Sequence, residues 1–281
     1  MSGTASRKFS QLDVFTDTPL RGNPLAVVHD ADGLSDTQMA AFARWTNLSE
    51  TTFLLKPTEP GADYRVRIFT PTLELPFAGH PTLGSCHAWL AAGGQPGQAG
   101  EVVQQCTKGL VRIRRDGTRL AFAAPPCERR EVAPALLAAV LDAIGLAADE
   151  LVASQWLDNG PQWLALQLRS AERLLALRPD NAKLKSLAWV GLVAPQPAGA
   201  DTQFEVRAFI APDGIEEDPV TGSLNASLAG WLMERGEAPA QYVAAQGSAM
   251  GRAGRIHVHQ DGDSLWIGGD VADCIEGQIR L

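Results

Sequence analysis

The sequence lacks several features that mark whole classes of protein. Its four cysteines lie far apart and form no Cys-x-x-Cys pair. In a chain this long, that spacing favours reduced thiols in a cytoplasmic protein over a disulfide scaffold. No run of about 18 apolar residues is present to cross a membrane, and the polar start, residues 1–8, has no signal-like apolar core. The sequence therefore predicts a cytoplasmic protein with no membrane partner.

An excess of positive charge and the common phosphate-binding motifs are also missing. The chain has 24 basic and 32 acidic residues, a net charge of −8, which argues against non-specific binding to nucleic acid. No G-x-G-x-x-G, G-x-x-x-x-G-K-[ST] or G-x-S-x-G run occurs, so a dinucleotide cradle, a P-loop and a hydrolase elbow are unsupported. A small anionic substrate is still compatible, because a local pocket can oppose the net charge.

The chain instead contains an internal repeat. Four short segments of the first half match four of the second half in the same order, at offsets that drift only from 137 to 145 residues. The matched pairs are Gly22–Val28 with Asn159–Ala165, Tyr64–Phe69 with Phe204–Phe209, His80–Ser85 with Asp218–Ser223, and Val111–Leu120 with Ile256–Leu265. Self-similarity of this kind predicts two homologous halves, which we expect at residues 1–126 and 127–281, with the last strand able to return to the first half.

Both halves follow one secondary-structure template. In the first half, a capping box at Ser35–Gln38 predicts a helix to about Trp45, and Pro81 predicts the start of a helix that ends near Gly93. The predicted strands of this half are Phe9–Phe15, Leu25–Val28, Thr51–Lys56, Tyr64–Phe69, Val111–Ile113 and Leu120–Ala123. The second half repeats the order with segments at Trp163–Leu168, Ser170–Leu177, Leu187–Val193 and Phe204–Ile210, a helix from Pro219 to about Glu234, and a hairpin about Asp261–Gly262. The prediction is an α+β fold of two pseudo-symmetric lobes, each a curved, barrel-like mixed sheet around a central helix.

The loops that lead into the two proline-containing helices are the strongest candidates for a site. A helix N-terminus presents free N–H groups and partial positive charge to a carboxylate, and Gly79 and Gly222 would let a ligand approach the backbone. A twofold repeat is expected to bring such loops together at a cleft between the halves.

The two copies differ where chemistry would need them to differ. His80 precedes Pro81 in one half and Asp218 precedes Pro219 in the other, so an imidazole and a carboxylate are available for proton transfer or substrate orientation. Glu50 has no counterpart, because the 138-residue offset puts Ala188 opposite it. At the mouth of an apolar strand its pKa would rise toward a useful range, although a solvated Glu at a loop–strand junction explains it equally well.

Other candidates are weaker. His257 and His259 share one face of a strand without an evident third ligand, so we predict no metal. Arg252, in the glycine-rich run Gln246–Arg252, is a candidate partner for an anionic group, with a plain connecting loop as the equal alternative. Asn23 is included as a candidate for substrate binding.

These motifs together resemble the PhzF-like family of phenazine biosynthesis. The resemblance rests on Arg21–Pro24, Asn47–Thr51, Pro76–Thr82, Glu217–Ser223 and Gln246–Val258, and it extends over nearly the whole chain from Phe9. It implies a diaminopimelate-epimerase-like fold with the active site between two lobes, no cofactor or metal, and a homodimer.

The resemblance also implies roles for single residues. Glu50 matches the family's general acid/base, His80, Asp218 and Ser223 match its substrate-orienting residues, and Gly79 with Gly222 match its backbone donors. The implied activity is isomerisation of a small carboxylated, dihydroaromatic or similar substrate by a single carboxylate. Epimerase relatives use a cysteine on each side, and neither His80 nor Asp218 is a cysteine. An epimerase or racemase of an amino-acid-like compound, and a binding protein that keeps the fold without turnover, remain the alternatives.

Overall fold

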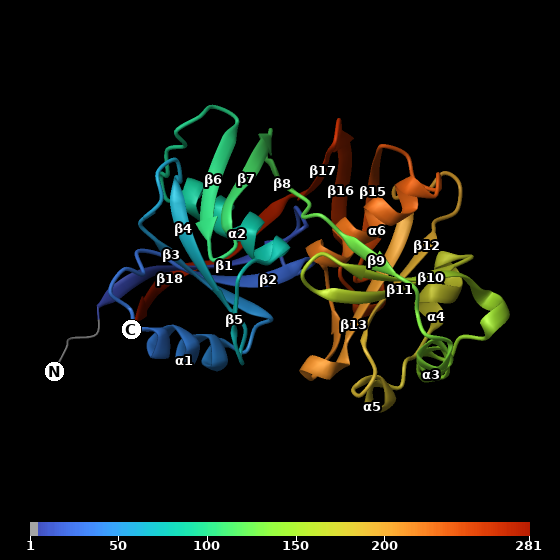
Figure 1. Cartoon of the computed structure of the whole chain (residues 1–281). Coiled ribbons are helices and arrows are strands. Elements are labelled where there is room, and N and C mark those ends of the chain that lie inside the picture. Colours follow the sequence, from blue (N-terminus) through green and yellow to red (C-terminus); the bar gives the residue numbers. More distant parts are fainter. Residues whose placement is uncertain (1–4) are drawn as a thin grey trace. The chain divides into compact units, whose positions relative to one another are not determined.

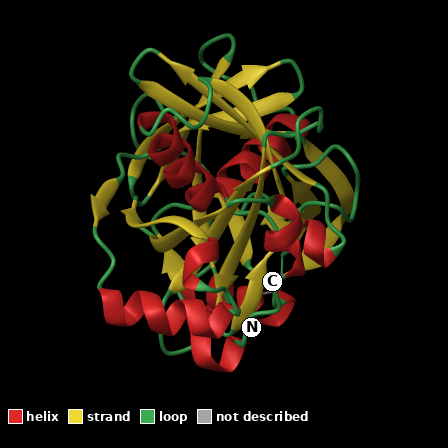
Figure 2. Cartoon of the chain, turned by 90° about the vertical axis from the view of Figure 1, so that its right-hand side faces the viewer, coloured by secondary structure: helices red, strands yellow, loops and turns green. Residues whose placement is uncertain are grey.

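The computed structural model describes residues 5–281; residues 1–4, part of the polar start, lie outside the described range. The chain divides into two compact units, and each is described by itself: unit 1 comprises residues 1–123 and 268–281, and unit 2 comprises residues 124–267. Strands, yellow in Figure 2, make up most of the regular structure. Among the described residues, no helix is long and apolar enough to cross a membrane.

Unit 1 is built on a mixed sheet (Figure 1). β2 pairs antiparallel with β1 and parallel with β3, β3 pairs antiparallel with β4, and β4 pairs antiparallel with β5 and parallel with β6, which continues antiparallel into β7 and β8. Its elements are β1 (Ser6–Val14), β2 (Asn23–Val28), α1 (Asp36–Thr46), β3 (Glu50–Leu55), β4 (Tyr64–Phe69), β5 (Glu74–Leu75), α2 (Gly79–Ala91), β6 (Glu101–Cys106), β7 (Gly109–Asp116), β8 (Arg119–Ala123) and β18 (Val271–Arg280).

Unit 2 repeats this pairing order. β11 pairs antiparallel with β10 and parallel with β12, β12 pairs antiparallel with β13, and β13 pairs antiparallel with β14 and parallel with β15, which pairs antiparallel with β16. Its elements are β9 (Glu128–Arg130), α3 (Pro134–Ile144), β10 (Leu151–Asp158), β11 (Gln162–Leu168), α4 (Ala171–Ala176), α5 (Asn181–Leu184), β12 (Trp189–Pro195), β13 (Phe204–Ile210), β14 (Ile215–Asp218), α6 (Gly222–Glu234), β15 (Gln241–Gln246), β16 (Gly254–Asp261) and β17 (Ser264–Gly269).

The outermost strand of each unit comes from the end of a repeat. β18, the last strand of the chain, pairs antiparallel with β1 in unit 1. β9, which follows the eight strands of the first repeat, pairs antiparallel with β10 in unit 2. β9 and β18 each follow the eight strands of one repeat in the sequence. β9 completes the sheet of unit 2, and β18 completes the sheet of unit 1.

A buried helix lies at the centre of each unit. α2 packs against most strands of the unit 1 sheet, namely β1, β2, β3, β4, β6, β8 and β18, and most of its residues are buried. α6 is apolar on nearly every face and equally buried, which is typical of a central helix. Glycine permits close packing in both: a Cβ on Gly84 of α2 would lie 2.5 Å from Leu25, and one on Gly191 of β12 would lie 2.3 Å from Leu224 of α6.

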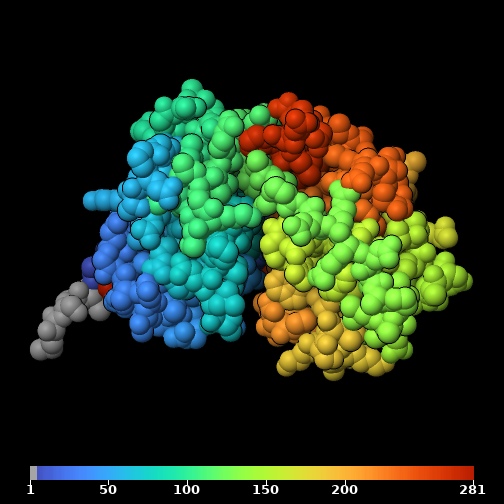
Figure 3. Space-filling model, viewed as in Figure 1, coloured from blue at the N-terminus to red at the C-terminus, as the bar shows by residue number. Residues whose placement is uncertain are grey.

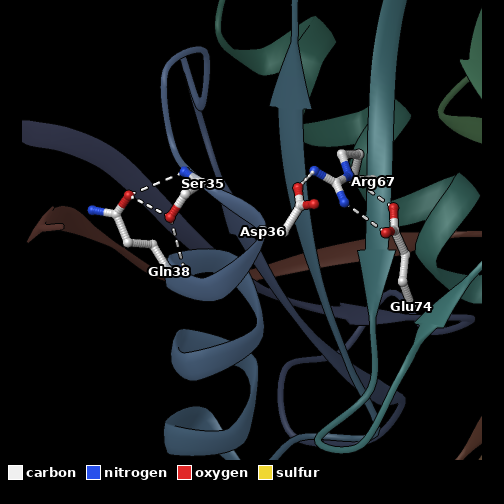
Figure 4. Close-up of polar contacts among 5 residues, drawn as sticks. All are labelled: Ser35, Asp36, Gln38, Arg67 and Glu74. Carbon is white, nitrogen blue, oxygen red and sulfur yellow. Dashed lines mark hydrogen bonds and ion pairs between the residues drawn. The ribbon is translucent and has the colours of Figure 1, made fainter.

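The surface helices are amphipathic, with one buried apolar face and one exposed face. α3 buries Val140 and Ile144 and exposes Ala138 and Asp142, and this part of the chain is green in the space-filling view of Figure 3. α1 begins with the predicted capping box: Gln38 N–H donates to the Ser35 hydroxyl (3.3 Å), and Ser35 N–H donates to Gln38 Oε1 (3.0 Å). Figure 4 shows both bonds.

Two predicted segments need correction or refinement. The second central helix was predicted from Pro219, but α6 begins at Gly222. The three residues before it are held in extended or loop conformation, and Thr221, with φ −117° and ψ 103°, precedes the first helical residue. The segment Ser170–Leu177 contains the short helix α4, whose first turn is capped by the Ser170 hydroxyl accepting from Arg173 N–H at 3.2 Å.

Candidate active site

The first cluster of functional side chains lies in unit 1, at one edge of its sheet. β2 and β3 are parallel, and Leu25 of β2 stands opposite Glu50, the first residue of β3. Asn23 is the first residue of β2 and is fully buried. Because parallel strands begin at the same edge of a sheet, the local fold carries the Asn23 amide and the Glu50 carboxylate to one edge.

His80 joins these two residues from the first turn of α2. Its Nε2 lies 3.2 Å from Glu50 Oε2, and its Nδ1 lies 3.4 Å from Asn23 Nδ2. With the Asn23 amide donating to Nδ1, the ring proton resides on Nε2, which faces Glu50. The Nε2–Oε2 contact is close but not aligned as a full hydrogen bond, a geometry that catalytic pairs often tighten when substrate binds.

Burial sets the charge of this histidine. The His80 ring is 5% exposed, and desolvation lowers its pKa to about 3, because burial disfavours the charged form. His80 is therefore a neutral imidazole at ordinary pH. It can offer a hydrogen bond to Glu50 or to a ligand without bringing a positive charge.

The second cluster lies in unit 2 around Asp218, the last residue of β14. The Thr221 hydroxyl donates to Asp218 Oδ2. Gln246, at the end of β15, donates from Nε2 to the Asp218 carbonyl (3.1 Å) and to the Thr221 hydroxyl (2.9 Å), and its Oε1 accepts from Thr221 N–H (3.0 Å). Asn225 Nδ2 also donates to Gln246 Oε1 (2.8 Å). The Thr221 hydroxyl thus holds the Asp218 carboxylate, and Gln246 and Asn225 hold Thr221 and the Asp218 backbone in place.

Ser223 is held by a different set of contacts at the start of α6. Its hydroxyl accepts from Trp163 Nε1 (3.2 Å), and its carbonyl accepts from Asn159 Nδ2 (2.9 Å). Both donors lie at or just before β11, the strand that corresponds to β2 of unit 1. The hydroxyl therefore has a defined position from which its proton can be donated to a ligand.

The helix N-termini have the predicted amide groups. In α2 the first helical bond runs from Thr82 N–H to Ala78 (3.2 Å), after Gly79 and His80. In α6 it runs from Asn225 N–H to Thr221 (3.1 Å), after Gly222 and the next two residues. Amides that precede the first bond of a helix are suited to binding an anionic oxygen.

Arg252 lies in a segment that packs against the Asp218 loop. Its N–H donates to the Gly247 carbonyl (3.0 Å). Gly247 has φ +89°, and a Cβ there would lie 2.7 Å from the Pro219 carbonyl oxygen. The close approach explains the glycine and puts the Arg252 backbone next to the loop that carries Asp218.

The remaining candidates do not form reactive or metal-binding groups. Cys86 is buried, which raises its pKa to about 12, so it is a poor nucleophile. All four cysteines are free. Within residues 5–281, no group of three or more His, Cys, Asp or Glu side chains is arranged to hold a metal ion.

Sequence reasoning missed the residues that hold Asp218 in place. Thr221, Gln246 and Asn225 are all nearly inaccessible to solvent, and buried polar side chains are expected to be hydrogen-bonded. Asn225 lies between two apolar residues, which was an available signal. Thr221 and Gln246 are each followed by Gly-Ser, which is typical of a loop and conceals their burial.

Comparison with known proteins first defines the class of protein. A solved structure of a predicted epimerase from Pseudomonas aeruginosa superposes with a TM-score of 0.78 at 31% identity, covering 97% of this chain and 99% of that one. The predicted α+β, epimerase-like fold is thereby confirmed.

The sequence comparisons then identify the family. Residues 12–276 match the PhzC-PhzF family, described as phenazine biosynthesis-like protein. Antisense-enhancing sequence 1 of Schizosaccharomyces pombe is 35% identical over 96% of this chain and 97% of its own length. Trans-2,3-dihydro-3-hydroxyanthranilate isomerase of P. aeruginosa is 34% identical over 98% of this chain and 99% of its own. The chain belongs to the phenazine biosynthesis-like family and is an isomerase of the PhzF-like type.

Proposed function

We propose that this isomerase moves a proton within a small carboxylated substrate, and that Glu50 is its single general acid/base. The observation that carries the proposal is the Glu50–His80 contact, in which a carboxylate at a strand end lies 3.2 Å from a buried imidazole. Ala188, its counterpart at the 138-residue offset, is an apolar residue with 7% exposure. A carboxylate with no counterpart in the repeat favours a one-base proton shift over a reaction that uses two equivalent bases.

The proposed reaction is balanced without a cofactor. The Glu50 carboxylate takes a proton from one carbon while the electron pair moves along the conjugated system to form a new double bond. The resulting carboxylic acid returns the proton to another carbon on the same face. Neutral His80 would orient Glu50 in both steps, since its Nε2 faces the Glu50 carboxylate at 3.2 Å and can donate a hydrogen bond to it once the pair is aligned.

We assign the second cluster a binding role in the same reaction. Asp218, fixed by Thr221 and Gln246, would orient a polar group of the substrate, and the Ser223 hydroxyl would donate to it. The amides of Gly79 and Gly222 would contact anionic oxygen. A carboxylated substrate suits these helix N-termini, and the P. aeruginosa relative is named for a carboxylated dihydroaromatic compound, so we propose that substrate class here.

Exchange of solvent hydrogen tests the assignment of Glu50. The protein is incubated in heavy water with trans-2,3-dihydro-3-hydroxyanthranilate and related dihydroaromatic acids, and deuterium in the product is followed by mass spectrometry and NMR. We expect deuterium at the carbon that receives the proton, and loss of exchange in Glu50→Gln. Glu131→Gln, at an exposed position, is the matched control and should exchange like the wild type. Exchange that persists in Glu50→Gln would overturn the role of Glu50.

A second candidate is an epimerase, favoured by the 31% identity to the structure described as a predicted epimerase. The product separates the two reactions. A proton shift moves a double bond, whereas epimerisation inverts a stereocentre, with solvent deuterium at that centre and the bonding pattern unchanged.

A further inference from the structure

Both units contain an arginine at the same point of the repeat with the same set of contacts. Arg67 of β4 and Arg207 of β13 are 140 residues apart, within the segments Tyr64–Phe69 and Phe204–Phe209. Each guanidinium lies over the phenylalanine two residues later, at 5.1 Å from the Phe69 ring and 4.8 Å from the Phe209 ring. Each also forms a bidentate pair with a glutamate of the short strand that leads to a candidate site loop.

In unit 1 this pair, drawn in Figure 4, is partly exposed. Arg67 donates from Nε and Nη2 to the two carboxylate oxygens of Glu74 (2.7 and 2.6 Å), and from Nη1 to Asp36 of α1 (2.5 Å). The Arg67 and Glu74 side chains are 16% and 31% exposed. The arrangement joins α1, β4 and β5.

In unit 2 the corresponding pair is more deeply buried. Arg207 donates from Nε and Nη2 to the two oxygens of Glu217 (2.9 and 2.8 Å), and their side chains are 6% and 11% exposed. Its Nη1 donates to the carbonyls of Leu174 and Leu177, at the end of α4 (3.1 and 2.9 Å). All three guanidinium nitrogens are therefore occupied, and α4, β13 and β14 are joined at one point.

A buried ion pair of this kind adds little net stability to the fold, but it fixes the relative orientation of its two side chains. The cost of desolvating two charges largely offsets their attraction, whereas the planar fork of arginine fits a carboxylate in one relative orientation. The consequence for function depends on what lies next to the glutamate.

The two units differ at that point. Glu217 immediately precedes Asp218, and Asp218 stands opposite Ala208, the residue after Arg207. In unit 1, Glu74 is six residues before His80, which is already held within α2. Asp218 lies before its helix begins, so its position depends on β14 as well as on the hydrogen bonds from Thr221 and Gln246.

We propose that Arg207 and Glu217 are positioning residues for Asp218, and that they act by fixing β14 in register. The proposal rests on the role assigned above to Asp218. It predicts that loss of the bidentate geometry, with both charges kept, displaces the Asp218 carboxylate. The corresponding change at Arg67 and Glu74 is predicted to leave Asp218 unaffected.

The first test observes Asp218 directly and needs no substrate. The full-length protein is labelled with aspartate carrying 13C at the side-chain carboxyl carbon, and the Asp218 signal is assigned by its loss in Asp218→Asn. Arg207→Lys and Glu217→Asp keep the charges but break the fork. We expect both to move or broaden the Asp218 signal, while Arg67→Lys and Glu74→Asp leave it in place. An Asp218 signal unchanged in both unit 2 variants would overturn the proposal.

The second test asks whether the pair acts through Asp218. In the exchange assay, at a temperature where thermal unfolding shows each variant folded, Arg207→Lys and Glu217→Asp should lower kcat by roughly 10- to 100-fold, the effect of misplacing a reacting group by about 1 Å. KM should change less. Added to Asp218→Asn, either change should produce no further loss, because residues that act as one unit are not additive.

The outcomes separate this proposal from the proposed function. If Asp218→Asn leaves turnover intact, the role of Asp218 fails whatever the pair does. If Asp218→Asn lowers turnover and the fork variants lower only the melting temperature, the pair is structural and the positioning proposal is wrong. A loss in the fork variants that adds fully to that of Asp218→Asn would also contradict it.

Discussion

The two units share one order of strands but surround their candidate residues differently. In unit 1 the partner of the Glu50 carboxylate is a titratable group, His80, which burial keeps neutral. In unit 2 the Asp218 carboxylate accepts from the hydroxyl of Thr221, and the Gln246 amide donates to the Asp218 backbone carbonyl. The two units keep the same order of strands but differ in the side chains around their candidate residues. A carboxylate beside an imidazole suits proton transfer, whereas one that accepts from a buried hydroxyl suits binding.

The start of the central helix differs as well. By the repeat, His80–Ser85 corresponds to Asp218–Ser223, yet α2 includes all of the first segment whereas α6 begins only at Gly222. His80 is consequently oriented by a helical turn, and Asp218 by side-chain hydrogen bonds. The two copies of the motif therefore hold their candidate side chains differently, one by helical backbone and the other by side-chain hydrogen bonds.

The largest expected effect is a loss of kcat, and it should be greater for Glu50, the proposed acid/base, than for Asp218, the proposed binding residue. Glu50→Gln should lower kcat by roughly 10³- to 10⁴-fold, the upper part of the range for loss of a general acid/base. Asp218→Asn should lower it by roughly 10²-fold, as for loss of one orienting interaction. Steady-state kinetics of purified, folded variants measure both. Equal losses of kcat in the two variants, or a larger loss in Asp218→Asn, would contradict the assignment of proton transfer to Glu50 and of substrate binding to Asp218.

The pH dependence of stability should differ in sign between the units. The folded-state pKa of His80 is about 3, below the ~6.5 of an unfolded chain. Below pH 6.5 the unfolded state binds a proton that the folded state does not, so stability falls on acidification toward pH 3, by at most ~1.4 kcal/mol per pH unit. In unit 2, burial raises the pKa of Glu205, so its contribution is present below the unfolded pKa and lost as pH rises through the folded one.

Urea unfolding between pH 3 and pH 7 tests this contrast. The stability difference between wild type and His80→Gln should shrink as pH falls from 6.5. The difference between wild type and Glu205→Gln should move the other way as Glu205 becomes protonated. Parallel curves for His80→Gln and wild type would show that the imidazole is not held neutral.

Two buried threonines provide a narrower comparison. The Thr82 hydroxyl of α2 accepts from Gln104 Nε2 (3.0 Å), and the Thr221 hydroxyl donates to Asp218 and accepts from Gln246. Replacing either by Val leaves a buried amide without its acceptor, at a cost of about 1–3 kcal/mol. Only Thr221→Val should also lower kcat, by roughly tenfold, since about 1.4 kcal/mol of orientation is lost. An equal fall in kcat for Thr82→Val would assign the effect to general loosening.

The fold was largely predictable because its signals are local or repeated. The capping box at Ser35 and the strand Tyr64–Phe69 were predicted within a residue of their observed bounds. The start of α6 was not, since proline at a first helical turn is only a preference, and the Thr221–Gln246 contact at 3.0 Å spans 25 residues. The last strand was expected only as able to return to the first half, and no local pattern identifies β1 as the strand that it pairs with.

The candidate residues were predictable as types but not in their surroundings. Glu50 and His80 were singled out separately, by the absence of a counterpart and by the motif before Pro81. Their 3.2 Å contact depends on the parallel pairing of β2 with β3 and on the seating of α2 against both. The pKa of His80 follows from its burial, which no neighbour in sequence determines. The hydrogen-bond network around Asp218 was missed for the same reason.

The smallest expected effect concerns the helices that connect the parallel strands. α1 has a reciprocal capping box between Ser35 and Gln38, whereas at α4 the Ser170 hydroxyl accepts a single bond from Arg173 N–H. Ser35→Ala and Ser170→Ala should each cost about 1 kcal/mol of unfolding free energy. Ser35→Ala should cost a few tenths more, because the Gln38 side chain loses its reciprocal partner. Urea midpoints at neutral pH measure the difference, and turnover should not change. A larger loss at Ser170 would show that the arginine of unit 2, which binds the carbonyls at the end of α4, depends on that cap; the crossover helix would then help to position Asp218.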